Sequence, residues 1–558
     1  MLRGTDVSAC VHQLALRWGP PQPLTTAPLS PEGQRRIREA QRWRDEAIAR
    51  IVASHPGSVL ARNVEDTVDA IARGVDVIAD PRLPDDDEGH RRATVHALVR
   101  VGRRGESFTY APVIVRNAEI VEPSSTRQLP VTSLESLSPM TATVRGGVAP
   151  RASVTRYGLS LVHTLEMLAA NGHADAHRRG ALVDRQGEVW WFHLGNDDHP
   201  RFNHEVYGHQ YRERLAVLEA HERWSRDGGD FPTRPAWHRA CDACDFAAVC
   251  EAELSVADDV SLVRFTNFEQ QELLRDHGVT TRVQLAALDP VRAAKARDLP
   301  GQALAADAGV EEHLGRQVTK LDELIYRARV SVAGSYLRIG PAEATSCPTA
   351  DVEIDVDMES YNDVTYFWGA AVRCAPHVTG VSEGYQAFVS FEPLTDEVEA
   401  RVFADFWEWF AEVRRVTLDQ GATFAAYCFW AHAEDSAMNR ALVNQPVGGI
   451  TRDEVDVFRR SPGQWVDIYA VVKEQIQTDG PLGLKQVAKA AGFDWRDEAP
   501  GGEASMTWYE TAVGDDDAAH AARARLLAYN EDDCLATRAL RDWLNGPARA
   551  LPSRDEPR

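Results

Sequence analysis

Residues 352–359 read VEIDVDME, a strict alternation of apolar and acidic side chains. Successive side chains of a β-strand point to opposite faces, so the pattern predicts a strand with one apolar and one acidic face. The acidic face carries four carboxylates: Glu353, Asp355, Asp357 and Glu359. Like charges in a row repel one another unless water, cations or basic groups screen them. The apolar segments 365–372 and 385–391 predict neighbouring strands, so the acidic strand lies inside a sheet and a divalent cation is the economical explanation.

Two further acids follow predicted elements later in the chain. Glu434 comes directly after the predicted strand 423–429, and Asp533 lies on a predicted helix. Hydrolysis of a phosphodiester by two metal ions needs several hard oxygen ligands that converge on those ions. Strands come first, and helix 396–415 and later helices follow, which indicates an α/β domain with a mixed sheet.

Three short motifs occur in order in this region: D-M-E at 357–359, F-W-A-H-A-E at 429–434 and Y-N-E-D-D at 529–533. Together they resemble the motifs of DEDD exonucleases, which have an RNase H-like fold. The resemblance covers about 340–548. Three intervening segments look like a RecB-associated subfamily with this domain: WVDIYAVV (465–472), LGLKQVAKAAGF (482–493) and TWYE (507–510).

The resemblance implies four ligands for Mg²⁺ or Mn²⁺: Asp357, Glu359, Glu434 and Asp533. It also implies that Tyr529, one helical turn before Asp533, orients the attacking water. Glu434 stands where the family has Asp, which keeps the charge but adds a methylene. Asp355 and Asp532 are alternatives if either motif is shifted, and Asp467 is either a group that positions a ligand or a helix N-terminal acid. As structure alone, Tyr529 and Asp533 would be a surface i,i+4 pair.

The chain has eight cysteines: Cys10, Cys241, Cys244, Cys250, Cys347, Cys374, Cys428 and Cys534. Disulfides are not expected in a cytosolic protein, so a cysteine cluster asks for a metal. Three cysteines form a C-x₂-C-x₅-C segment at 241–250. This segment fits half of a zinc site or a redox pair. The fourth ligand would be His238, His221 or the distant Cys10.

Residues 1–255 resemble the RecB-like iron–sulfur nucleases of the PD-(D/E)XK fold. One N-terminal cysteine with C-x₂-C-x₅-C, Glu46 on an early helix, and the segments HTLEMLAANG and GALVDRQGEVWWFHL carry the resemblance. It implies a [4Fe–4S] cluster, with Zn²⁺ as the alternative, held by four thiolates: Cys10, Cys241, Cys244 and Cys250.

The nuclease site of this N-terminal domain is predicted to be degenerate. The fold needs two acids and a lysine on adjacent strands, but the aligned positions hold His96, Ile114 and Arg116. An isoleucine cannot ligate Mg²⁺. The domain is therefore expected to keep a scaffold that binds DNA without cutting it. The alternative is a shifted, intact site that uses other acids: Asp76, Asp80 or Asp184.

Local patterns predict further elements. Helices are expected at 31–54 and 158–171, and strands at three segments: 95–101, 110–116 and 188–194. The segments 85–88 and 122–147 are expected to be exposed loops. Residues 256–338 are predicted to be helical: Gly278 ends one helix, and Thr281 with Gln284 forms a capping box for the next. This layout resembles a helix-hairpin-helix that presents amides to a phosphate, and a helical linker is the alternative.

Length and charge limit the partners. A chain of 558 residues is expected to form several domains, here 1–255, 256–338 and 339–558. The net charge of −23 argues against a general basic coat for nucleic acid. Contact with nucleic acid would then come from local basic surfaces. One candidate is an arginine-rich predicted helix, which could instead be only a solvated helix face; its arginines are Arg35, Arg36, Arg38, Arg42 and Arg44. No apolar segment reads as a membrane span or a signal peptide, so a cytoplasmic protein is expected.

These patterns predict a multi-domain α/β nuclease that hydrolyses single-stranded DNA or RNA from 3′ to 5′ in DNA repair or recombination. There is no Walker A motif, so any helicase would be a separate partner. The alternative is an inactive iron–sulfur adaptor that binds nucleic acid, with both nuclease folds degenerate.

Overall fold

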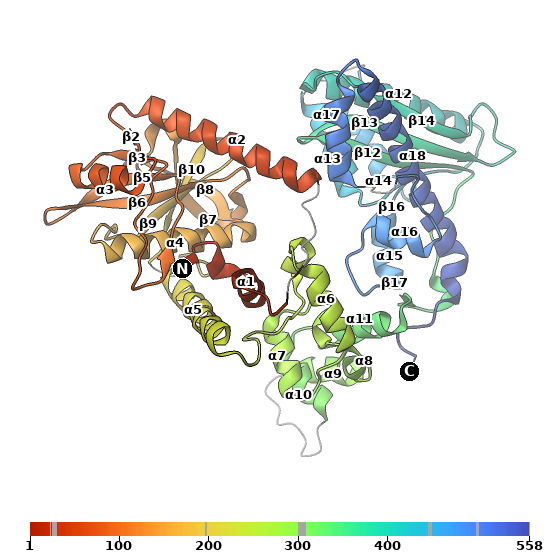
Figure 1. Cartoon of the computed structure of the whole chain (residues 1–558). Helices are drawn as coiled ribbons and strands as arrows, with labels where there is room; N and C mark the ends of the chain where they lie inside the picture. The colour runs from red at the N-terminus through yellow and green to blue at the C-terminus, as the bar shows by residue number, and fades with distance from the viewer. Residues whose placement is uncertain are drawn as a thin grey trace. The chain divides into compact units, whose positions relative to one another are not determined.

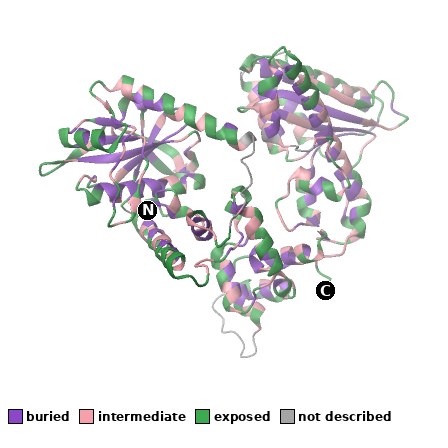
Figure 2. Cartoon of the chain, in the orientation of Figure 1, coloured by how far each residue is buried: buried purple, intermediate pink, exposed green. Residues whose placement is uncertain are grey.

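The computed structural model describes residues 1–22, 24, 31–195, 198–298, 309–444, 449–497 and 501–556. The chain forms two compact units: Met1–Pro235 with Ala243–Val249, and Ala236–Asp242 with Cys250–Arg558. Each unit contains its own mixed sheet (Figure 1), and buried residues concentrate on the strands and on the helix faces that cover them (Figure 2). No helix within the described ranges is long and apolar enough to cross a membrane. The broad prediction of an α/β protein with mixed sheets is confirmed.

The first unit is built on an eight-stranded sheet with the order β2-β3-β5-β6-β9-β10-β7-β8. Its strands are β2 Val59–Leu60, β3 Val77–Ala79, β5 Ala97–Arg104, β6 Ser107–Val115, β7 Val121–Ser133, β8 Thr143–Pro150, β9 Arg179–Val183 and β10 Glu188–His193. The pairs β2/β3 and β6/β9 are parallel and the others are antiparallel. A separate parallel pair joins β1 Leu2–Arg3 to β4 Arg91–Arg92.

Helices cover both faces of this sheet. They are α1 Val11–Trp18, α2 Pro31–Ser54, α3 Val64–Arg73, α4 Thr155–Ala170 and α5 His204–Asp227. One apolar cluster joins α4 to the strands through Leu161 and Leu182, and another joins α2 through Ile51 and Trp191. Alternate residues of the central strands therefore enter cores on opposite faces, as period-two geometry requires.

The predicted helices and strands of this unit are confirmed to within a few residues. The predicted loop at 122–147 is wrong, because this segment forms most of the β7–β8 hairpin. The hairpin lies at the sheet edge and exposes most of its residues on both faces, so it lacks the apolar alternation that identifies a strand.

Helices dominate the segment before the second sheet. They are α6 Ala247–Val256, α7 Phe268–Asp276, α8 Arg282–Ala286, α9 Pro290–Asp298, α10 Val310–Gln317 and α11 Leu321–Ala333. Gly278 follows α7 with φ +81°, and Thr281 and Gln284 form the predicted capping box of α8. Both predictions are confirmed, since they depend only on neighbouring residues.

The second unit contains a five-stranded sheet with the order β14-β13-β12-β15-β16. Its strands are β12 Val352–Tyr361, β13 Val364–Cys374, β14 Gly384–Val389, β15 Phe424–Cys428 and β16 Trp465–Asp467. The β14/β13/β12 pairs are antiparallel, and the β12/β15/β16 pairs are parallel. A small antiparallel pair joins β11 Leu337–Arg338 to β17 Ile476–Gln477.

The two faces of β12 meet different helices. The helices of this region are α12 Asp396–Asp419, α13 His432–Asn444, α14 Arg452–Arg460, α15 Ile468–Gln475, α16 Leu484–Ala490, α17 Gly502–Ala512 and α18 Asp517–Asn545. Val352, Ile354 and Val356 pack in one core with residues of α12, α13 and α14. The acidic face of β12 contacts α18 and α17. The predicted division of this strand into an apolar and an acidic face is therefore confirmed.

Candidate metal centre

The four acids of β12 fall into two pairs with different surroundings. Arg541 donates to Asp355 through Nε at 2.8 Å and through an amino group at 2.9 Å, and Arg538 Nε adds a contact of 3.1 Å. Arg541 also lies 3.0 Å from Glu353, which accepts a 2.7 Å bond from Arg373. Arginines on α18 and β13 therefore neutralise the first pair.

Arg541 anchors this ion-pair network in the interior. Its side chain has no exposed surface, and its guanidinium carbon lies 3.8 Å from the ring centre of Tyr427. Burial alone would raise the pKa of Glu353, but Arg541 and Arg373 hold that pKa below its ordinary value. Asp355, an alternative ligand in the sequence analysis, is thus committed to a structural ion pair.

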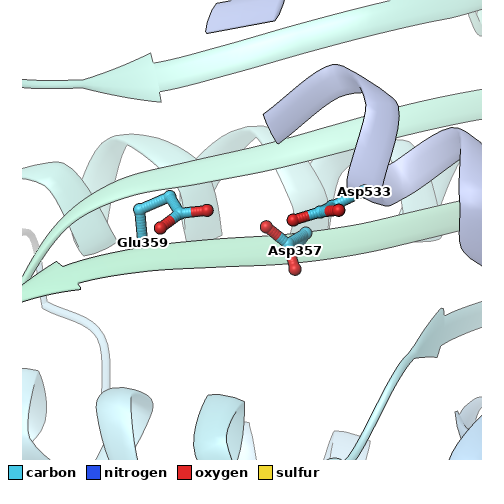
Figure 3. A group of neighbouring side chains, drawn as sticks. All are labelled: Asp357, Glu359 and Asp533. Atoms are coloured by element: carbon cyan, nitrogen blue, oxygen red, sulfur yellow. The ribbon is translucent and has the colours of Figure 1, made fainter. Parts of the chain in front are cut away.

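The second pair of acids meets Asp533 of α18. One oxygen from each of Asp357, Glu359 and Asp533 lies within 4.8 Å of the others (Figure 3). Within the described ranges this is the only group of three or more histidine, cysteine or acidic residues with that spacing. Glu359 and Asp533 are buried, and Asp357 is half-buried. The trio is a candidate site for a divalent cation.

Each acid of the trio accepts a hydrogen bond from a neutral donor, and Asp533 is also hydrogen-bonded to the hydroxyl of Tyr529. Asn530 Nδ2 donates to Asp357 Oδ2 at 2.8 Å, and Ser505 Oγ donates to Glu359 Oε2 at 2.7 Å. Trp495 Nε1 donates to Asp533 Oδ1 at 2.6 Å. A carboxylate has about four acceptor positions, so these bonds orient the three groups and leave acceptor positions for a cation.

Burial raises the pKa values of all three carboxyl groups of the trio, and repulsion between the carboxylates adds to this effect. Burial raises the pKa of Asp357 well above its ordinary value, and the charges of Asp533 and Glu359 raise it further. Burial, and after it the charge of Asp533, raise the pKa of Glu359 to about 8. Burial also raises the pKa of Asp533, against the charge of Lys485. A cation that binds the ionised carboxylates would offset this cost.

Glu434 lies beside this trio but outside it. It is in the first turn of α13, is 4% exposed, and its charge contributes to the raised pKa of Asp357. Burial raises the pKa of Glu434 itself to about 8. Its Oε2 is buried and has no hydrogen-bond partner. A buried acceptor normally has a partner, and a metal ion near Asp357 would be a partner for Glu434 Oε2.

Tyr529 lies one turn before Asp533 on α18, as the motif requires. Burial and the charge of Asp533 raise the pKa of its hydroxyl. The hydroxyl accepts a hydrogen bond from Lys485 Nζ, and that amine lies 4.5 Å from the ring centre. Tyr529 is 3% exposed, so it is not a residue of a surface pair.

Two other acids have structural partners. Asp532 accepts bonds from Arg496 Nε at 2.8 Å and from the Arg496 amide at 2.9 Å. Asp467 caps α15 by accepting from the amides of Tyr469 and Ala470. The interpretation of Asp467 as a helix N-terminal acid is therefore correct, and Asp532 is an ion-pair residue.

Four residues near the trio were not predicted from the sequence: Lys485, Trp495, Ser505 and Asn530. Asn530 lies within the third motif, and Lys485 lies within the LGLK segment that carries the subfamily resemblance. Their positions could have drawn attention to them. Ser505 and Trp495 carry no such signal, because a single serine or tryptophan has many structural uses.

The structure does not gather the predicted cysteine ligands into one cluster. No cysteine is part of a candidate metal group within the described ranges. His221 Nε2 is hydrogen-bonded to the carbonyl of Gly19 at 2.9 Å. Neither the iron–sulfur cluster nor the zinc alternative receives support.

The residues at the predicted degenerate site of the first unit do not form a metal centre. Burial, together with the charges of Arg44 and Arg116, lowers the pKa of His96 to about 4, and its Nδ1 accepts from the amide of Val115. Ile114 is buried, and Arg116 stacks on Tyr157 at 3.8 Å. The alternative acids are dispersed: Asp184 accepts from Trp190, Asp76 pairs with Arg100, and Asp80 lies 3.5 Å from Arg82.

Comparison with known proteins bears on the second sheet. Residues 430–545 match the RNase_H superfamily. The match includes Glu434, Tyr529 and Asp533, and β12 with Asp357 and Glu359 lies before it. No curated protein and no solved structure matches the chain. An RNase H superfamily domain with an acidic group of this kind suggests hydrolysis of phosphodiester bonds in nucleic acid.

Proposed function

We propose that the region 339–558 is a metal-dependent nuclease that removes nucleotides from single-stranded DNA or RNA in the 3′→5′ direction. The observation that carries this proposal is the close grouping of the Asp357, Glu359 and Asp533 carboxylates, the last of which lies within the RNase_H superfamily match. Asp357 and Glu359 are the acids of β12 that remain for a cation, since Glu353 and Asp355 are paired with arginines.

The donor set fits Mg²⁺ or Mn²⁺. Both ions prefer carboxylate oxygens, and Asp357, Glu359 and Asp533 supply several. Glu434, with its unpartnered buried Oε2, would be the fourth ligand. When bound, two such ions activate a water molecule and stabilise the leaving oxygen of the phosphodiester.

The chain's own residues prepare this site. Asn530, Ser505 and Trp495 each fix one carboxylate, so the ligands need not reorganise. The raised pKa of Tyr529 keeps its hydroxyl protonated at neutral pH. Tyr529 would therefore orient the attacking water through a hydrogen bond and would not remove its proton. Lys485, bonded to the same oxygen, holds that hydroxyl in place.

The first unit would not contribute hydrolysis under this proposal. A neutral, partly buried histidine, an isoleucine and an arginine offer no set of hard oxygen ligands at its predicted site. A role in binding DNA remains a proposal for this unit.

The test is cleavage of a short single strand, labelled at its 5′ end, by the purified full chain with Mn²⁺. We expect a ladder that shortens from the 3′ end, and we expect Asp533→Asn to abolish it. Asp542→Asn is the matched control, because Asp542 lies on the same helix but is half exposed and pairs with Arg373. No cleavage by the wild type, or equal cleavage by Asp533→Asn, would reject the proposal, and release of the labelled end first would reject the polarity.

A further inference from the structure

Trp430 has an unusual backbone and an unusual exposure. It lies between β15 and α13, has φ +73°, and its side chain is 50% exposed. A positive φ is uncommon for residues other than glycine, and for a bulky side chain it marks a constrained position. Glycine and asparagine adopt a positive φ at lower steric cost, so they are the residues expected at such a loop position.

Specific contacts hold this conformation. The Trp430 amide donates to Asp467 Oδ1 at 3.0 Å, and the same carboxylate caps α15. The Trp430 carbonyl accepts from the Ala433 amide at 3.1 Å, at the start of α13. The indole ring lies 5.6 Å from the ring of His432. The exposed indole is therefore presented from a fixed loop.

This loop follows β15, the strand that pairs with the acidic strand β12. β15 runs parallel to β12, and the last pair is Asp355 with Tyr427. β15 ends one residue later, at Cys428, so Trp430 comes two residues after the end of this strand, and Asp357 comes two residues after Asp355 on β12. Glu434, one turn into the next helix, acts electrostatically on Asp357. Trp430 thus lies on the chain between the end of β15 and the proposed ligand Glu434.

An exposed aromatic face beside a phosphodiester site fits an unpaired nucleobase. Stacking on an aromatic side chain tolerates any base, but it requires a base that is not paired in a duplex. Lys485 is a basic group whose charge acts on the trio, and the exposed indole of Trp430 adds a surface that can hold a base. We propose that the indole of Trp430 stacks on an unpaired base of the nucleotide at the carboxylate site. This inference rests on the proposed function and names a residue that would select its single-stranded substrate.

The experiment measures binding without turnover. In an Asp533→Asn background, fluorescence anisotropy gives the Kd for a labelled single strand and for the same strand with abasic sites at its 3′ end. We expect the Asp533→Asn parent protein to bind the complete strand about tenfold more tightly than the abasic strand, since the stacking of one base contributes an effect of this order. Trp430→Ala should remove this difference, and Trp430→Phe should retain most of it.

Phe265→Ala is the matched control, because Phe265 is another exposed aromatic with positive φ, 60% exposed and stacked on Arg327. It should bind both strands as the parent does. A Trp430→Ala variant that still discriminates between the strands, or a parent that does not, would overturn the inference. If discrimination is present but the wild type cleaves nothing, the proposed function fails and the stacking site stands.

Discussion

Asn530 holds Asp357: its Nδ2 donates to Asp357 Oδ2 at 2.8 Å, while its Oδ1 accepts from the hydroxyl of Tyr385 at 2.6 Å. This amide lies against the backbone of Gly369, where an added Cβ would come 1.6 Å from Asn530 Oδ1. The glycine on β13 thus leaves the space that the amide needs to orient the metal ligand.

Gly369→Ala should therefore weaken metal binding without changing any ligand. Displacing a residue that orients a ligand typically costs about 10–100-fold in metal affinity or activity. Mn²⁺ affinity, measured by calorimetry, checks this. Gly340→Ala is the control, since its added Cβ meets no atom within 4 Å. Wild-type affinity in Gly369→Ala would show that the Asn530 contact does not matter.

Substitutions of Asp355 and Asp357, which lie two residues apart on β12, should have different effects: the first on stability and the second on activity. Asp355→Asn leaves the fully buried Arg541 without its main partner, so the free energy of unfolding should fall by about 3 kcal/mol. Asp357→Asn should leave stability unchanged or higher and should abolish cleavage. Denaturant unfolding followed by circular dichroism, beside the cleavage assay, measures both. A stable, active Asp357→Asn variant would contradict this division of roles.

The strand that carries these acids shows what the sequence could predict. The alternation at 352–359 was sufficient to assign a strand and its acidic face, because that pattern is local. It could not show which acids are neutralised, since Arg538 and Arg541 come from a helix more than 180 residues later. The same limit applies to Trp495 and Ser505, which reach the site only through the fold.

The errors have the same physical origin. The hairpin within 121–150 was predicted to be a loop because both of its faces are largely exposed and no apolar period marks it. The cysteine spacing at 241–250 resembles that of a ligand set, but spacing along the chain does not place a distant fourth thiolate such as Cys10. Local patterns predicted helices, strands and caps well, but they could not predict which residues distant in the sequence lie together in the fold.

Trp495→Phe should leave the Asp533 carboxylate less firmly oriented and so weaken the binding of Mn²⁺. The substitution keeps an aromatic side chain but removes the 2.6 Å hydrogen bond to Oδ1. Hydrogen bonds to charged groups contribute about 1.5–3 kcal/mol, so Mn²⁺ affinity should fall about tenfold. Trp465→Phe removes a comparable indole bond to Asp435, at 3.2 Å, and should leave the affinity unchanged. Equal effects of the two variants would show that the loss is not specific to the site.

The raised pKa of Glu359 predicts a pH-dependent stability. Its pKa is about 8 in the folded, metal-free protein and close to its ordinary value when unfolded. Protonated Glu359 thus favours the folded state at low pH, and this contribution is lost as the pH rises towards 8. Glu359→Gln, which stays neutral, should raise Tm by a few degrees at pH above about 8 and by less near pH 5. Thermal unfolding without metal measures both values, and an identical gain at each pH would argue against the raised pKa.

The central claim is that Asp357, Glu359 and Asp533 form a divalent metal site, and titration of Mn²⁺ into the full chain by isothermal calorimetry tests it most directly. We predict saturable binding by the wild type, unchanged binding by Asp542→Asn, and loss of binding by Asp533→Asn. Absence of saturable binding in the wild type, or undiminished binding in Asp533→Asn, would contradict the account.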